Sequence, residues 1–169
     1  MCIFAVEKST NMREAKASII DQTELVSLYT ITFENDELSE FEKFMEKFRD
    51  NATLQRDYQM ILLALEKITS HGALERNFRP EGKMNDDVVA LPIEKSRLRL
   101  YCLRLTDKIL ILGNGGEKNT KTYEESEELS GYVMDLQKFD ALLEQEQKNG
   151  KIKIEQNVIT GIESASFEL

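Results

Sequence analysis

The sequence predicts an α+β fold in which a small, mostly antiparallel sheet carries a helical hairpin on one face. Two observations lead to this prediction. Two consecutive segments with helical spacing of apolar residues follow one strand-like segment, and three short segments rich in β-forming residues come after them. The expected order is therefore β-α-α-β-β-β-α. A length of 169 residues and a hydrophobic content of 41% suit one domain with one buried core.

The N-terminal part is expected to contribute one strand. Residues 1–24 have weak periodicity and mixed polarity, which indicates an N-terminal extension with a short helix over Met12–Ile20. From Leu25 to Glu34 the residues alternate as in a strand. Three side chains of this strand are expected to pack in the core: Tyr29, Ile31 and Phe33.

The helical hairpin is expected directly after this strand. Asn35 and Asp36 close the strand and can cap a helix. A second helix is predicted over Thr53–Ser70, with Gly72 as its natural end. The apolar stripe of the first helix consists of Leu38, Phe41, Met45 and Phe48.

The rest of the chain is expected to complete the sheet and add a third helix. A loop containing Pro80 and Gly82 precedes three strands of an antiparallel meander. A long helix is predicted over Glu124–Asn149, and residues 150–169 form a C-terminal tail with a short edge strand near Ile154. A single domain thus spans residues 25–149. The meander strands are predicted over Val88–Ile93, Arg97–Leu105 and Lys108–Leu112.

Composition excludes several classes of protein. No apolar run approaches the roughly 20 residues that span a bilayer, and Met1–Val6 is too short for the apolar region of a signal peptide. We therefore expect a cytoplasmic protein without a membrane partner. Cys2 and Cys102 are the only cysteines and His71 is the only histidine, so we expect no disulfide framework, metal site, cofactor or His-dependent nucleophile.

Charge is distributed unevenly along the chain. The net charge is −9, yet the segment from Gly72 to Lys121 holds ten basic and seven acidic residues. Within it, Arg97, Arg99 and Tyr101 share one face of a predicted strand because side chains alternate. Such a local excess of cations suits the binding of phosphate groups. The other basic residues expected near this strand are Arg76, Arg79, Lys83, Arg104, Lys108, Lys118 and Lys121.

The glycine-rich stretch Gly113–Gly116 has two interpretations. Its backbone N–H groups could form a concave anion site, but the spacing matches neither a Walker loop nor Gly-x-Gly-x-x-Gly. A flexible strand exit is the favoured interpretation.

These residues carry a resemblance to a known family. The element order, the strand Arg99–Cys102, and Leu110–Leu112 leading to Lys118–Thr122 resemble the RelE/HigB-type toxins of toxin–antitoxin modules, in particular their phage-related branch. Those proteins show an Arg-x-x-Tyr-like strand and then a strand ending in Leu-His-x-Phe-x-Lys-Lys-Thr-x-Lys-Thr-Pro. The resemblance covers residues 28–143. In the second motif Leu112, Lys118, Lys121 and Thr122 match, whereas Gly113, Gly115, Glu117, Asn119 and Tyr123 depart from it, as Cys102 does from the first.

The resemblance implies a small, metal-independent endoribonuclease that cuts mRNA, often on the ribosome, and that is held inactive by a cognate antitoxin, which can be of helix-turn-helix type. In that chemistry Arg99 and Lys118 would stabilise the charge of the phosphorane, and Tyr101 would transfer a proton. The residues expected to bind the RNA are Arg76, Arg79, Lys83, Arg97, Arg104 and Lys121.

Two alternatives stay open at the level of sequence. The chain could be a catalytically inactive RelE-like module that binds protein or nucleic acid, which the acidic total and Glu117 at a lysine position favour. It could also be an unrelated α+β domain whose basic hairpin is merely solvated.

Overall fold

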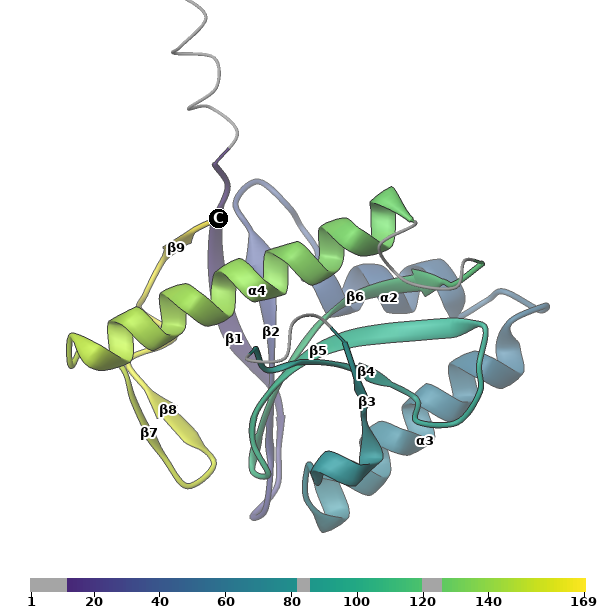
Figure 1. The fold of residues 1–169 in the computed structure, drawn as a ribbon, viewed down its shortest axis with the longest axis horizontal. Coiled ribbons are helices and arrows are strands. Elements are labelled where there is room, and N and C mark those ends of the chain that lie inside the picture. The colour runs from purple at the N-terminus through teal and green to yellow at the C-terminus, as the bar shows by residue number, and fades with distance from the viewer. Residues whose placement is uncertain (1–11, 82–85, 120–125) are drawn as a thin grey trace, which may run out of the picture.

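The computed structural model describes residues 12–81, 86–119 and 126–169. In this part of the chain a seven-stranded sheet has helices on both faces (Figure 1). The strand order is β3-β4-β5-β6-β2-β1-β9, and every neighbouring pair is antiparallel except β2 and β6. The strands of this sheet are β1 (Glu14–Gln22), β2 (Ser27–Phe33), β3 (Arg79–Pro80), β4 (Val88–Leu91), β5 (Leu98–Thr106), β6 (Ile109–Glu117) and β9 (Phe167–Glu168).

The α+β class and the mostly antiparallel sheet are confirmed, but the predicted order and the small sheet are wrong. The helix expected over Met12–Ile20 is strand β1. Ala15 and Ala17 are buried while Lys16 and Ser18 are exposed, which is the period of a strand. The sequence misled because this short stretch is stabilised by pairing with β2 rather than by its own periodicity.

The predicted helical hairpin is confirmed by α2 (Glu40–Phe48) and α3 (Gln55–His71). Ser39 begins α2 with a capping box, since its Oγ accepts from the backbone N–H of Glu42 and Glu42 accepts from that of Ser39. Gly72 follows α3 with φ of +110°, a conformation that favours glycine. Both helices pack on one face of the sheet in an apolar core that includes Phe44, Ile61 and Leu100.

The third helix, α4 (Glu127–Lys148), packs on the opposite face. Figure 1 shows it crossing the strands on the side away from α2 and α3. Tyr29, Ile31 and Phe33 are buried as predicted, but they face α4 and not the hairpin. Helices thus cover both faces of the sheet, and Arg99 and Tyr101 lie on the face that α4 covers.

The strand expected near Ile154 is present as β7 (Lys153–Glu155), but it pairs with β8 (Val158–Thr160) in a separate two-stranded sheet and is not an edge of the main sheet. This small sheet packs beside α4, where the N–H of Ile159 donates to the hydroxyl of Tyr29 at 3.2 Å. None of the helices in the described ranges has the length and apolar character to cross a membrane.

Candidate anion-binding site

Strand β5 presents two different faces. Leu98, Leu100 and Cys102 face the hairpin core, while Tyr101 and Leu103 face α4. Alternation places Arg99 on the α4 face, opposite Gly116 of β6. Two of the three residues predicted to share a face are covered: Arg99 is 4% exposed and Tyr101 is fully buried.

Arg99 is a buried cation whose guanidinium makes few contacts. Its Nη1 donates to the backbone oxygens of Ser96 at 2.7 Å and Leu98 at 2.9 Å. Its buried Nε has no hydrogen-bond partner, and no carboxylate of the described residues forms an ion pair with it. Burial lowers the pKa of Arg99, and the charge of Arg79 lowers it further. An unpaired buried donor is costly, so an acceptor brought to this position would be stabilised.

Two further cations lie near Arg99 around one carboxylate. Arg79 of β3 pairs with Ala90 of β4, and Ala90 pairs with Tyr101 of β5. Residues that pair across neighbouring strands point to the same face of the sheet, so Arg79 lies on the face of Tyr101. Burial raises the pKa of Glu81, and the charges of Lys118, Arg99 and Arg79 act against this. Arg79, Lys118 and Glu81 are half-buried, so they connect Arg99 with the surface. We call Arg79, Glu81, Arg99 and Lys118 the cationic cluster.

Glu81 was missed by the sequence analysis. Its neighbour Arg79 was singled out, but the loop between α3 and β4 has no periodicity that shows which side chains turn towards β5. The signal available was the sequence Arg79-Pro80-Glu81, which combines opposite charges beside a residue that restricts the backbone.

Three other residues expected to bind RNA lie in the described part of the chain, and their side chains are held or exposed elsewhere. Arg97 is exposed and donates from Nη2 to Oε1 of Glu117 at 2.5 Å. Arg104 donates from Nε to the backbone oxygen of Ala73 at 2.7 Å, which ties β5 to the segment after α3. Arg76 is exposed on the short helix Glu75–Asn77. Lys83 and Lys121 lie outside the described residues.

The glycines of β6 have a packing role rather than that of a flexible exit. They lie within the strand, and a Cβ at Gly115 would come within 1.9 Å of the backbone oxygen of Arg99. A Cβ at Gly116 would lie 3.0 Å from Leu129 of α4. The absence of side chains here lets β5 and α4 approach β6 closely.

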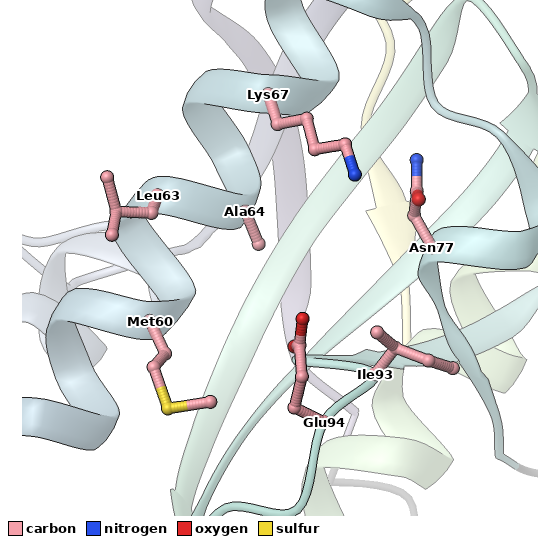
Figure 2. Close-up of a pocket in the computed structure, with 7 residues that line it drawn as sticks. All are labelled: Met60, Leu63, Ala64, Lys67, Asn77, Ile93 and Glu94. Atoms are coloured by element: carbon pink, nitrogen blue, oxygen red, sulfur yellow. The ribbon is translucent and has the colours of Figure 1, made fainter.

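A separate groove of about 250 Å³ lies on the outer side of α3. Figure 2 shows Met60, Leu63, Ala64 and Lys67 of α3 on one side, with Ile93 and Glu94 facing them. The groove shares no residue with the cationic cluster, and its two charged side chains have opposite signs. It is therefore a poorer anion site than the cluster.

Comparisons with protein-family models, curated proteins and solved structures gave no match to this chain. The fold and the cluster together describe an α+β protein with a partly buried group of cations at one corner of its sheet, next to the start of α4.

Proposed function

We propose that the protein is a RelE-like module that binds the phosphate backbone of RNA at the cationic cluster without cleaving it. The observation that carries the proposal is the buried Arg99 with its unpaired Nε, flanked by Arg79 and Lys118. Lys118 and Arg79 would contact phosphate oxygens directly. Arg99 would act from beneath them, because a charge in a poorly solvated environment produces a stronger field than one in water.

Binding without cleavage is favoured by the position of Tyr101. Its side chain is fully buried in the core under α4, whereas proton transfer to RNA requires contact with the reacting atoms. The position where the RelE/HigB motif has its first lysine holds Glu117, and this carboxylate binds Arg97. A ribonuclease would therefore lack an accessible tyrosine for proton transfer and a lysine at position 117.

The second candidate is the toxin itself, an endoribonuclease that a cognate antitoxin neutralises. One observation favours it: Arg99 and Lys118, the two cations assigned to catalysis, both act on the same carboxylate, Glu81. Their charges therefore act on a common region, as the stabilisation of one phosphate would require. An acidic antitoxin segment placed over the cluster would supply the negative charge that Arg99 lacks.

The test uses a labelled single-stranded RNA and the full chain, with binding followed by fluorescence anisotropy as salt is varied. Lys118→Gln should weaken binding and reduce the salt slope by about 0.7, the contribution of one phosphate contact on a single strand. Glu81→Gln should strengthen binding because it removes the only carboxylate of the cluster. Arg97→Gln is the matched control, since Arg97 is exposed and paired outside the cluster.

The same samples distinguish the two candidates. Intact RNA after incubation, alone and on translating ribosomes, supports the binding module. Cleavage that disappears in Lys118→Gln supports the ribonuclease instead. Absence of RNA binding at low salt, or equal loss in Lys118→Gln and Arg97→Gln, would contradict a site at the cluster.

A further inference from the structure

Strand β1 has an open outer edge. β9 pairs with Glu14 and Ala15 alone, and within the described residues no strand pairs with Lys16–Gln22 on that side. Figure 1 shows β9 beside one end of β1 only. An open edge offers backbone hydrogen-bonding groups to another strand.

The backbone groups that face outward can be identified. Arg13 and Leu169 exchange both backbone hydrogen bonds, at 3.0 and 2.8 Å. On the other side, Glu14 accepts from the N–H of Glu34 at 2.8 Å. The backbone N–H and C=O groups of successive residues point to opposite sides of a strand. Those of Ala17 and Ile19 therefore point to the open edge.

Apolar side chains flank this edge on both faces of the sheet. Ile19 is 36% exposed and lines a groove with Val158 of β8 on the α4 face. Ile20 is 41% exposed and lines a second groove with Phe41 and Leu62 on the hairpin face. A strand added at the edge would cover both isoleucines.

The charges of the edge are self-complementary. The register with β2 shifts between Ile19 and Asp21, so Ile20 and Asp21 both line the groove on the hairpin face. Lys16 lies on that face as well, two residues before Ser18. When two copies of β1 pair antiparallel about Ser18, Ala17 of one falls opposite Ile19 of the other, and Lys16 falls opposite the Ile20–Asp21 bulge.

We propose that this edge joins a second copy of the chain, through antiparallel pairing of β1 with β1 about a two-fold axis at Ser18. The pairing uses all four outward backbone groups of Ala17 and Ile19 in each copy. It also brings Lys16 of each copy to Asp21 of the other, so the contact is locally neutral although the chain carries a charge of −9. The proposal is independent of the anion site.

The test is the mass of the full chain as a function of concentration, measured by sedimentation and light scattering. The wild type should form dimers. Lys16→Asp and Asp21→Lys should each weaken self-association roughly tenfold or more, because like charges then face each other twice across the axis. An equal mixture of the two variants should form the mixed dimer, in which both charge pairs are attractive again.

Each single variant serves as the folding control for the other, since only a folded partner can restore association. Lys67→Asp, on the outer face of α3, changes an exposed charge away from the edge and should leave dimerisation unchanged. High salt should reduce the difference between the wild type and the single variants. A monomeric wild type, full dimerisation of either single variant, or no association in the mixture would overturn the proposal. If the wild type is monomeric, the remaining candidate partner for this edge is a strand of a different protein.

Discussion

The two faces of the sheet contain cores of different character. The face under α2 and α3 is apolar and rich in aromatic rings: Phe44 lies 5.2 Å from Phe48 and 6.1 Å from Tyr58, measured between ring centroids. The face under α4 also has an apolar core, but Arg99, Asp140 and other ionisable groups surround it. The comparison indicates that the hairpin face mainly provides stability, whereas the α4 face combines packing with charge.

Burial has different consequences on the two faces for this reason. Removing apolar area from water stabilises both. On the hairpin face the pKa values that burial raises belong to Tyr58 and Cys102, which are neutral near pH 7 in any case. On the α4 face burial disfavours the charged form of Asp87 and Asp140, whose ordinary forms are ionised near pH 7. Variants on the hairpin face should therefore alter stability at every pH, and variants on the α4 face should alter its dependence on pH and ligand.

The largest effect is expected from Phe44→Ala. Phe44 is fully buried among three aromatic rings, so the substitution leaves a cavity that the rigid pair of helices cannot close. We expect a loss of about 3–5 kcal/mol in the free energy of unfolding. Urea unfolding at pH 5 and at pH 8 measures this loss in the free energy of unfolding, and it should be the same at the two pH values. A loss below about 1 kcal/mol would contradict a tightly packed hairpin face.

An intermediate effect is expected from Asp140→Asn on the α4 face. The pKa of Asp140 is raised to about 7, first by burial and second by the negative charge of Asp87. The folded pKa lies above the unfolded value of about 3.9, so the stability that Asp140 contributes should be fully present below about pH 4 and be lost as pH rises through about 7. The amide that replaces the carboxyl retains an oxygen to accept from the N–H of Asp87.

We expect Asp140→Asn to be more stable than the wild type at pH 8 by about 1–2 kcal/mol, a value reduced for partial exposure, and the difference to shrink at pH 4. Thermal unfolding across this pH range measures it. Asp50→Asn is the control, because the side chain of Asp50 is 88% exposed. A wild-type advantage at pH 8 would show that Asp140 is ionised in a favourable environment.

The smallest effect concerns a contact that joins the two faces. Lys47 of α2 donates from Nζ to the backbone oxygen of Gly115 at 2.9 Å and to the hydroxyl of Tyr132 of α4 at 3.0 Å. Lys47→Met should keep the apolar stem and lose these bonds, at a cost of about 1 kcal/mol. Lys138→Met, an exposed lysine of α4, is the matched control in the same unfolding measurement. Equal effects of both variants would mean that Lys47 adds no specific link.

The candidate site was predicted in part. Lys118 and Arg99 were chosen from the charge pattern around the predicted β5–β6 hairpin, and both belong to the cationic cluster. Arg97 was chosen by the same argument, but its exposed side chain binds Glu117 instead. Alternation shows which side chains share a face, yet it cannot show where a helix covers that face, so Arg97 is exposed and Arg99 is buried.

Elements with a local signal could be predicted without coordinates. The stripes of α3 and α4, the stop at Gly72 and the core positions of β2 all follow from side-chain period and backbone preference. The stripe of α2 was predicted in part, since Leu38 precedes the helix and Phe44 is its fully buried ring. The face that each helix covers, the strand conformation of β1 and the close approach of α4 to the glycines of β6 emerged from the folded chain alone. They could not be predicted because strand pairing and face assignment depend on contacts between residues far apart in the chain. Arg13 and Asp135, which join the start of β1 to α4 across 122 positions, have no pattern in the sequence that links them.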